Sequence, residues 1–319
     1  MNAYRSRVRG CLLGGAVGDA LGNPVEFERD PAVTDLMLSR DGLALITDDT
    51  QMTLFTVEGL LHAAGGDVPK SVYEAHLRWY DTQRRLGPPK HAAGLAAQPF
   101  LYAQRAPGNA CLGGLALGRM GTFAHPANPN SKGCGSVMRS APFGLFPSIS
   151  AADAFALAAE CAVHTHGHPT GYLAAGTFAA IVRHLLDGDD VRTATERAIE
   201  LLTGHDEHEE TLTALRRALD TPYAPGNTGI GRIGLGWIAE EALAMAVYAA
   251  LDAEEPERVR DALLVSVNHA GDSDSTGAIC GNLLGARHGE EALPAAWVAR
   301  LEGLDTISTI ADDLVEAAA

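Results

Sequence analysis

The sequence predicts an all-α protein, folded as a single compact, orthogonal helical bundle. Apolar residues recur at helical spacing along most of the chain, and we find no alternating, β-branched segments of the kind that strands need. Only 6% of the 319 residues are aromatic, so the core must be built mainly from Ala, Leu and Val, a mixture that suits closely packed helices. Hydrophobic residues reach 46%, which is enough to bury a sizeable core.

Each predicted helix is one run of helical periodicity. In chain order, the predicted helices cover residues 5–20, 49–64, 68–84, 151–163, 169–186, 191–202, 206–219, 235–251, 257–267, 276–287 and 307–317. Ser150 is a good N-cap for the helix that starts at residue 151, and Asp189 and Asp190 precede the helix 191–202 in the same way.

Glycine and proline concentrate between these helices, in residues 86–99, 106–121, 126–135 and 221–236. We interpret these segments as loops over a cleft, because no long polar Ser/Gly/Glu tract separates two halves of the chain. The chain also shows no internal repeat. We therefore expect residues 1–319 to form a single domain.

Composition excludes several classes of function. The formal net charge of −16 argues against sequence-independent nucleic-acid binding, which needs clustered Lys and Arg. An anionic small ligand stays compatible, because local backbone amides and bound cations can override the global field. The five cysteines share no Cys-x-x-Cys spacing, the N-terminus has no apolar signal core, and no apolar run reaches the ~18 residues that cross a bilayer. We expect a soluble, cytoplasmic protein without a membrane partner.

Two short acidic clusters, far apart in the chain, carry the main chemical signal. The first is Thr47-Asp48-Asp49-Thr50, and the second is Asp272-Ser273-Asp274-Ser275. A helix cap alone would explain the first cluster, whereas two Asp and two Ser exceed what a cap requires. Crowded carboxylates repel one another, and donors that are all oxygen favour Mg²⁺ or Mn²⁺ over Zn²⁺. If the clusters meet, the bundle has a central metal-containing cleft with two ions.

Other residues gain meaning only beside these clusters. Gly277, Gly281 and Gly285 form a smooth stripe that would let their helix pack closely against a partner. Glu26 lies in a sharp turn after the first predicted helix, where a solvated loop glutamate is the ordinary interpretation.

A glycine-rich turn precedes Arg139. Backbone amides exposed by Gly133 and Gly135 can bind a diphosphate, and Arg139 could add charge or anchor the loop. We interpret Cys134 as a small packed residue and not a nucleophile, because no activating base is recognisable. His166, from the pair His166 and His168, is expected to bond to substrate hydroxyls or neighbouring carboxylates.

Residues 229–234 match the Gly-x-Gly-x-x-Gly dinucleotide fingerprint in letters. The context fails, because a loop and no strand precedes them, so we reject a Rossmann interpretation. Trp237 follows in a segment that we expect to be helical, and it could line the cleft.

The ordered set of motifs resembles the ADP-ribosylglycohydrolase family, which includes the dinitrogenase reductase-activating glycohydrolases. The resemblance runs from about residue 6 to about residue 290 and keeps the family's order. It rests on residues 18–27, 47–50, 133–139, 165–166, 236–243 and 271–275.

This resemblance implies an all-α hydrolase with two Mg²⁺ (or Mn²⁺) ions that cleaves the C1″ linkage of ADP-ribose from a modified protein, nucleic acid or small molecule. It implies that one ion is bound by Thr47, Asp48 and Asp49, and the other by Asp272, Asp274 and Ser275, with Asp274 bridging. It also implies substrate contacts from the loop and the histidine, namely from Gly133, Gly135, Ser136, Met138 and His166. By the same resemblance, Glu26 matches the family's mobile glutamate beside the second ion. We expect the metals to hold the ribose hydroxyls while Glu26 or Asp49 assists proton transfer.

Two departures from the family pattern stand out. Ser275 replaces a common Thr but keeps the donor oxygen, and Cys134 replaces a common Asn in the glycine loop. The second departure leaves open the group to which ADP-ribose is attached. Two alternatives also stay open: a two-metal phosphohydrolase, and a non-catalytic ADP-ribose-binding relative that kept the fold.

Overall fold

The computed structural model describes residues 2–63, 66–224 and 227–318. Within these ranges the protein is built from helices and has no β-strand, only the isolated bridges Ala44–Leu301 and Gly133–Ile238. The all-α prediction is therefore confirmed. The α-helices are α1 (Asn2–Gly22), α2 (Asp48–Ala63), α3 (Val68–Thr82), α4 (Asn109–Ala116), α5 (Ala151–Ala162), α6 (Pro169–Asp187), α7 (Val191–Leu202), α8 (Glu209–Asp220), α9 (Asn227–Ile230), α10 (Ala239–Ala250), α11 (Val259–Val267), α12 (Ser273–His288), α13 (Ala295–Val298) and α14 (Leu304–Ala317).

Short 3-10 helices connect several of these elements. They are η1 (Asn23–Val25), η2 (Gly94–Ala97), η3 (Pro99–Tyr102), η4 (Cys134–Ser136), η5 (Ala141–Gly144), η6 (Pro256–Arg258) and η7 (Glu290–Ala292). The stretch after α1 is long and lacks α-helix until α2, so Glu26 and its neighbours lie in an irregular segment.

The predicted helices are all present, but their ends differ where local geometry overrides periodicity. Helix α10 starts at Ala239 and not at residue 235, because Gly236 has a positive φ of 82° and Ile238 is extended. Helix α12 starts at Ser273, so the second acidic cluster forms its first turn instead of preceding it. The predicted end of the second helix, residue 64, lies outside the described residues.

Helix α4 was not predicted, since its eight residues fall inside the expected loop 106–121. The segment is too short and too rich in glycine to show helical periodicity in the sequence. Its first turn contributes to the site described below.

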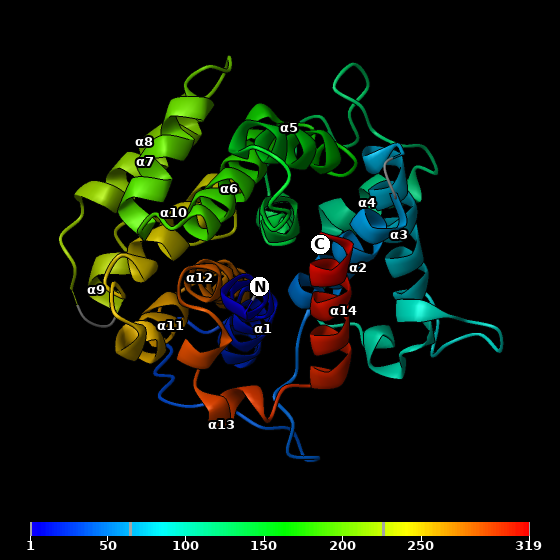
Figure 1. Cartoon of the computed structure of the whole chain (residues 1–319), viewed down its shortest axis with the longest axis horizontal. Helices are drawn as coiled ribbons and strands as arrows, with labels where there is room; N and C mark the ends of the chain where they lie inside the picture. The colour runs from blue at the N-terminus through cyan, green and yellow to red at the C-terminus, as the bar shows by residue number, and fades with distance from the viewer. Residues whose placement is uncertain (1, 64–65, 225–226, 319) are drawn as a thin grey trace.

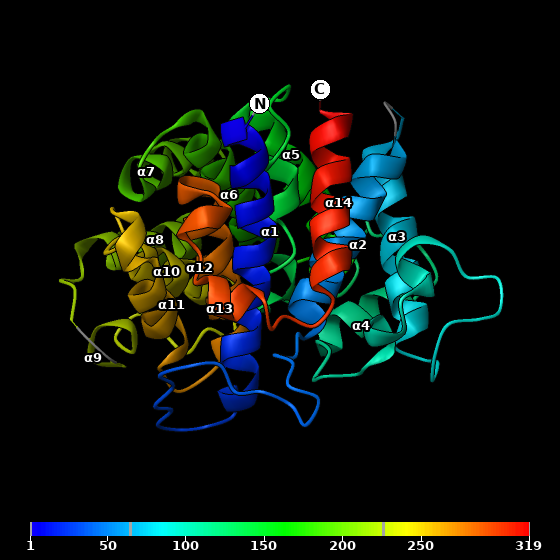
Figure 2. The same ribbon diagram turned by 60° about the horizontal axis from the view of Figure 1, so that its bottom comes forward.

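Helices α1 and α12 form the centre of the bundle and run antiparallel (Figures 1 and 2). Gly14 of α1 faces Gly281 of α12: a Cβ atom on Gly14 would lie 2.3 Å from the carbonyl oxygen of Gly281. Gly18 meets Gly277 in the same way, at 1.9 Å. The predicted glycine stripe on α12 thus packs against a second stripe on α1, and the two backbones approach closely because neither helix carries side chains there.

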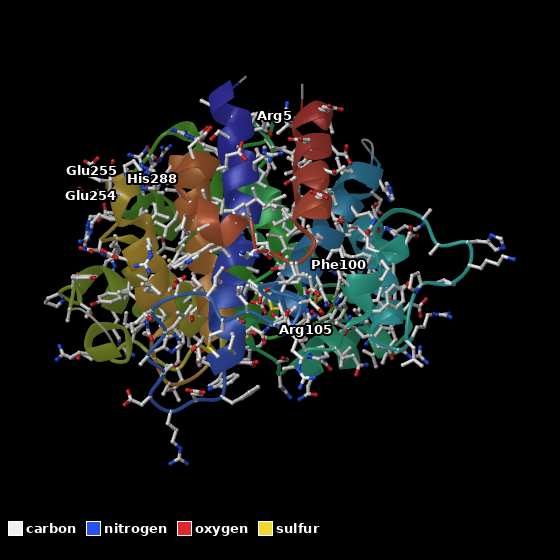
Figure 3. The ribbon with its side chains drawn as sticks, turned by 90° about the horizontal axis from the view of Figure 1, so that it is seen from below. Arg5, Phe100, Arg105, Glu254, Glu255 and His288 are labelled. Carbon is white, nitrogen blue, oxygen red and sulfur yellow. The ribbon has the colours of Figure 1, made fainter. Side chains whose placement is uncertain are left out.

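The remaining helices pack around this pair. Helices α14, α2 and α3 lie on one side, and α6, α10 and α11 lie on the other (Figure 1). Arg5 and Arg9 of α1 pair with Asp312 of α14, at 2.8 and 3.1 Å (Arg5 is labelled in Figure 3). In the described part of the chain, no helix is both long and apolar enough to cross a membrane.

This packing decides where the chemistry lies. The C-terminal end of α1 meets the N-terminal end of α12, because Gly22 packs against the backbone of Ser273 and Asp274. Helix α2 starts beside the same point, and its first residues are Asp48 and Asp49. Two helix N-termini that carry acidic clusters therefore converge at the end of the central helix pair.

Candidate active site

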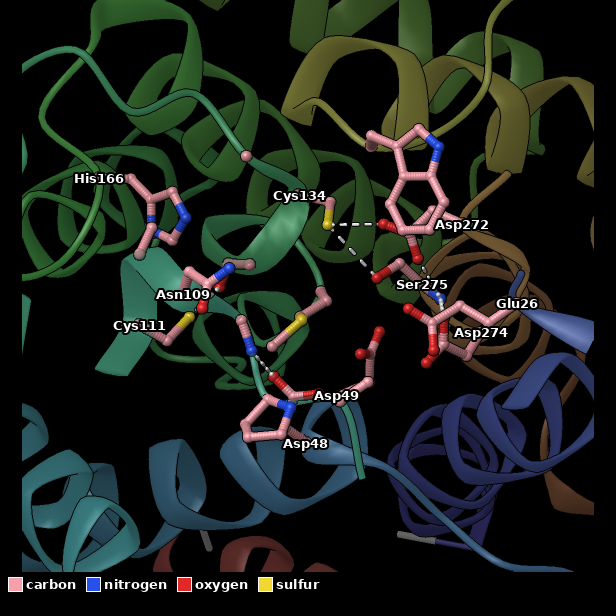
Figure 4. Close-up of a pocket in the computed structure, with 18 of the residues that line it drawn as sticks. Glu26, Asp48, Asp49, Asn109, Cys111, Cys134, His166, Asp272, Asp274 and Ser275 are labelled. Atoms are coloured by element: carbon pink, nitrogen blue, oxygen red, sulfur yellow. Dashed lines mark hydrogen bonds between the residues drawn. The ribbon is translucent and has the colours of Figure 1, made fainter. Parts of the chain in front are cut away.

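The two acidic clusters line one cavity of about 510 Å³ (Figure 4). Asp48 and Asp49 enter it from α2, and Asp272 and Asp274 enter it from the start of α12. Glu26, from the segment after α1, completes the acidic wall. The fold thus joins residues from three distant parts of the chain around one space.

Asp19 of α1 holds the first acidic cluster in place through hydrogen bonds to the start of α2. This fully buried carboxylate accepts hydrogen bonds from the backbone N–H of Thr47 at 3.0 Å and of Thr50 at 3.1 Å, and from the Thr50 hydroxyl. It therefore occupies the N-terminus of α2, where free N–H groups and the helix dipole favour a negative charge. The sequence interpretation gave Asp19 no role, although a carboxylate on an otherwise apolar, glycine-rich helix is a usable signal.

The second cluster is held by its own turn. Asp272 caps α12 by accepting from Ser275 N–H at 3.3 Å, and Asp274 accepts from the same N–H at 3.0 Å. Gly271 precedes this turn with a φ of 121°, and a Cβ atom there would lie 2.0 Å from the carbonyl oxygen of Leu235. Only glycine fits that position, so the chain enters α12 at a fixed angle.

Glu26 lies beside the second cluster, which is where the family resemblance places it. Glu26, Asp272 and Asp274 each offer an oxygen within 4.8 Å of the other two, and all three residues are buried. This spacing could hold a metal ion. The group thus adds Glu26 to the set of candidate ligands, beside its proposed part in proton transfer.

The crowded carboxylates that line this cavity are electrostatically unfavourable unless a cation lies between them. Burial, together with the charge of Asp274, raises the pKa of Asp48 to about 8 against the opposing hydrogen bond from Gly108. Burial and then the neighbouring carboxylates raise the pKa of Asp49 and of Asp272 well above the usual range. The Oδ1 atom of Asp49 is buried and has no hydrogen-bond partner. Buried, crowded oxygens of this kind fit a hard divalent cation.

The hydroxyl ligands expected from the sequence lie in different surroundings. Ser275 lines the cavity. Thr47 is fully buried, and its hydroxyl lies 3.4 Å from the Oδ2 of Asp49 and accepts from the N–H of Asp49 at 3.3 Å. Thr47 thus stands directly behind the carboxylate that it is expected to assist.

The glycine loop forms the opposite wall. Gly133, Gly135 and Met138 line the cavity together with His166. Ser136 lies behind them, because its hydroxyl donates to the carbonyl oxygen of Gly171 at 2.8 Å, which ties the loop to α6. The structure therefore gives the Ser136 side chain a supporting position and not one that faces the cavity.

Arg139 anchors this wall from the interior. It is 2% exposed and donates to the carbonyl oxygen of Gly135 at 2.7 Å and to the hydroxyl of Thr165 at 2.6 Å. That hydroxyl in turn lies 2.8 Å from the Nδ1 of His166. Burial, followed by the charge of Arg139, lowers the pKa of His166 well below its usual range, so the ring is neutral. Of the two predicted roles of Arg139, the anchor is the one observed.

Cys134 corrects an expectation. Its thiol is not packed away from the site: it lies 2.8 Å from the Oδ2 of Asp272 and 3.5 Å from the hydroxyl of Ser275, and it lines the cavity. Burial and the charges of Asp272 and Asp49 raise the pKa of Cys134 well above its usual range, so the thiol keeps its proton. This agrees with the view that Cys134 is no nucleophile.

Sequence reasoning missed two further parts of the site. Helix α4 brings Asn109 to the cavity, and the N–H of Gly108 donates to Asp48 at 3.0 Å. At the mouth, Phe27 stacks on Trp237 with ring centroids 5.8 Å apart, and both rings are exposed, at 73% and 39%. Trp237 had been expected at the cleft, whereas an exposed Phe27 carries no signal in a single sequence.

The whole chain, residues 1–319, matches the protein family described as ADP-ribosylglycohydrolase. The chain belongs to the ADP-ribosylglycohydrolase family. The resemblance drawn from the motifs is thereby confirmed, and members of the family hydrolyse ADP-ribose linkages.

Several relatives match nearly all of the chain. The ADP-ribosyl-(dinitrogen reductase) glycohydrolase of Rhodospirillum rubrum is 28% identical over 94% of this chain and 92% of its own length. The ADP-ribosylarginine hydrolase Tri1 of Pseudomonas putida (strain GB-1) is 26% identical over 98% of this chain and 78% of its own length. The ADP-ribosylhydrolase ARH3 of Homo sapiens is 24% identical over 97% and 93%.

A solved structure agrees with this assignment. It is described as an ADP-ribosylglycohydrolase-related protein complex and superimposes with a TM-score of 0.74 at 25% identity. The match covers 100% of both chains. The two chains thus share one architecture along their full length.

Proposed function

We propose that this protein is a divalent-metal-dependent hydrolase that cleaves the C1″ glycosidic linkage of ADP-ribose and releases it from a modified substrate. The observation that carries the proposal is the acidic cavity itself. Five buried carboxylates of Glu26, Asp48, Asp49, Asp272 and Asp274 converge there, and the fully buried Oδ1 of Asp49 has no hydrogen-bond partner. Family membership supplies the class of linkage.

The ligand types support two hard cations. We propose that Thr47, Asp48 and Asp49 hold one ion and that Asp272, Asp274 and Ser275 hold the other, with Mg²⁺ or Mn²⁺ favoured by the all-oxygen donors. The close group of Glu26 with Asp272 and Asp274 supports the second position. When bound, such ions supply positive charge and Lewis acidity.

The chain's own residues orient the substrate. We propose that backbone amides of Gly133 and Gly135 face the diphosphate and that the neutral His166 bonds to the ribose. Arg139 holds this loop by its bond to Gly135, so the amides are fixed before substrate arrives. Met138 adds an apolar contact from the same wall.

Proton transfer is assigned to Glu26 or Asp49. Burial, then the charges of Asp274, Asp48 and Asp19, raises the pKa of Glu26 to about 8 in the absence of a bound cation. The position of Glu26 beside the second cluster supports a part in proton transfer to the leaving group. Asp49 faces the same cavity and is the alternative residue for this proton transfer.

A variant of Asp274 tests the proposal. Purified protein is incubated with arginine-linked, serine-linked and acetyl-linked ADP-ribose, with Mg²⁺ or Mn²⁺ and with chelator. We expect free ADP-ribose from at least one substrate, loss of release with chelator, and a loss of at least about 100-fold in Asp274→Asn, since removal of one buried charge partner costs several kilocalories per mole. Excess Mn²⁺ should restore part of the rate.

The matched control is Asp261→Asn, which changes an exposed acid on α11 and should keep the full rate. Undiminished release of ADP-ribose with chelator present and Asp274 replaced would overturn the proposal. Release of AMP instead would favour a phosphohydrolase, and binding of ADP-ribose without cleavage of any linkage would favour a non-catalytic relative.

The five cysteines are unpaired, four of them buried. Because no disulfide crosslinks the loops, the cysteines support a reducing compartment, and we propose the cytoplasm as the location.

A further inference from the structure

Cys134 places a sulfur atom inside a shell of candidate ligands that are otherwise oxygen. Its Sγ donates to the Oδ2 of Asp272 at 2.8 Å and lies 3.5 Å from the Oγ of Ser275. Figure 4 shows the thiol pointing at these two side chains from the glycine loop. Sulfur is a softer donor than oxygen and favours different cations.

The position of this thiol is built into the fold. The backbone N–H of Cys134 donates to the carbonyl oxygen of Trp237 at 3.2 Å, and the neighbouring Gly133 forms a bridge with Ile238. Residue 134 also starts η4, so its backbone is fixed on both sides. The side chain is therefore directed at the start of α12.

A second observation points to a cation at the same place. Asp49 is 2% exposed, it lines the same cavity, and its Oδ1 atom is buried with no hydrogen-bond partner. In Figure 4 the carboxylate of Asp49 extends into the cavity on the side of Ser275. A buried carboxylate oxygen without a donor is costly unless a cation neutralises it.

We propose that Cys134 makes this centre a high-affinity site for thiophilic divalent cations, such as Zn²⁺ and Cd²⁺, which compete with the hard ions. This inference rests on the proposed function, because the same carboxylates serve both kinds of ion. The ligands are the thiolate of Cys134, the carboxylate of Asp272 and the hydroxyl of Ser275, with Asp274 or Glu26 as a fourth.

The binding step balances simply. The cation forms a bond to the sulfur, the S–H bond breaks, and the proton leaves to solvent. Two ligands of a tetrahedral Zn²⁺ with Zn–S and Zn–O bonds of about 2.3 and 2.0 Å lie about 3.5 Å apart. The sulfur already has this distance from Ser275, and its contact with Asp272 opens by less than an ångström when the hydrogen bond is replaced.

The residue at position 134 therefore decides which cations can bind at this centre. An Asn or Ser at this place offers oxygen and nitrogen only, whereas Cys lets a softer cation bind in a four-coordinate geometry that differs from the octahedral one of Mg²⁺. A cation held by Cys134 therefore blocks the position and inhibits hydrolysis.

The test titrates Cd²⁺ into chelator-treated, full-length protein and follows the ultraviolet charge-transfer band of the cadmium–thiolate bond. We compare wild type, Cys134→Ser and Cys111→Ser, since Cys111 also lines the cavity but its sulfur accepts from Arg139 at 3.3 Å. We expect the band with one equivalent of Cd²⁺ in wild type and in Cys111→Ser, and no band in Cys134→Ser. Circular dichroism verifies that each variant is folded.

A second measurement uses hydrolysis with Mg²⁺, each variant being normalised to its own rate. The Zn²⁺ concentration for half inhibition should be at least 10-fold higher in Cys134→Ser than in wild type. An unchanged band or equal Zn²⁺ sensitivity in Cys134→Ser would overturn the inference. Because the band is recorded without substrate, a protein that shows it but hydrolyses no linkage would refute the proposed function and leave the cation site standing.

Discussion

Asp19 illustrates how one buried residue prepares a site that it does not enter. Its oxygens take up N–H and O–H groups of Thr47 and Thr50, so the carboxylates of Asp48 and Asp49 are left to face the opposite way, into the cavity. Burial, then the charge of Asp274, raises the pKa of Asp19 to about 7. The pKa of Asp19 thus depends on the negative charge of a candidate metal ligand, Asp274.

Replacement of Asp19 by Asn should weaken this support. The amide is nearly the same size but presents an NH₂ group to backbone donors, so at least one hydrogen bond to a charged acceptor is lost. We expect Asp19→Asn to lower the free energy of unfolding by about 2 kcal/mol at pH 8 and to weaken Mn²⁺ binding. Urea unfolding and calorimetric titration measure the two effects. Unchanged Mn²⁺ affinity in a folded variant would show that Asp19 does not position the ligands.

At the scale of elements, the glycine seam between α1 and α12 links the two halves of the site. Helix α1 carries Asp19 below α2, and its glycines pack on α12 directly behind Asp272 and Asp274. The seam sets the distance between two N-termini that the repulsion of their carboxylates would drive apart. The seam therefore has an indirect but large effect on metal binding, because it sets the spacing of the carboxylates.

Gly281→Ala tests this linkage far from the ligands. The new methyl group would lie 1.9 Å from the carbonyl oxygen of Gly14, so the helices must separate. We expect a loss of about 1–3 kcal/mol of stability from overpacking, together with weaker Mn²⁺ binding. Gly87→Ala is the control, because nothing lies within 4 Å of that position. A stable variant with normal affinity would mean that the seam tolerates a wider spacing.

At the scale of the whole molecule, the excess of acidic groups at the centre makes stability depend on pH. Glu26 and Asp48 have folded pKa values of about 8, whereas in the unfolded chain carboxyls titrate near pH 4. Between about pH 4 and pH 8 the folded protein therefore binds more protons than the unfolded chain, so stability falls as pH rises through this window. Neutral, buried His164 and His166 act in the opposite sense only at lower pH, because their pKa values are lowered by burial and by Arg139.

We expect the melting temperature of chelator-treated protein to fall between about pH 6.5 and pH 8, and saturating Mg²⁺ to restore it. The increase in melting temperature on addition of Mg²⁺ measures the contribution of the carboxylates. Buried thiols with raised pKa values also make stability fall as pH rises, but they respond less to Mg²⁺. Differential scanning calorimetry at several pH values gives both curves. A melting temperature that stays constant, or a Mg²⁺ increment that shrinks with rising pH, would contradict this account.

The single domain of residues 1–319 stays a prediction. The central position of α1 and α12 agrees with it, since the first and one of the last long helices pack against each other from the Gly10–Gly285 contact to the Gly22–Ser273 contact.

The sequence by itself determined the helical class, the approximate helices, the two acidic clusters, the glycine stripe of α12 and the family. These follow from period, local spacing and residue type, which need no knowledge of distant contacts. Only the tertiary structure decided how closely Glu26 approaches Asp272 and Asp274, that Asp19 supports α2, and that the thiol of Cys134 faces Asp272. The reason is physical: the direction of a side chain after a turn, such as those at Gly236 and Gly271, depends on backbone angles and on packing partners far away in the chain.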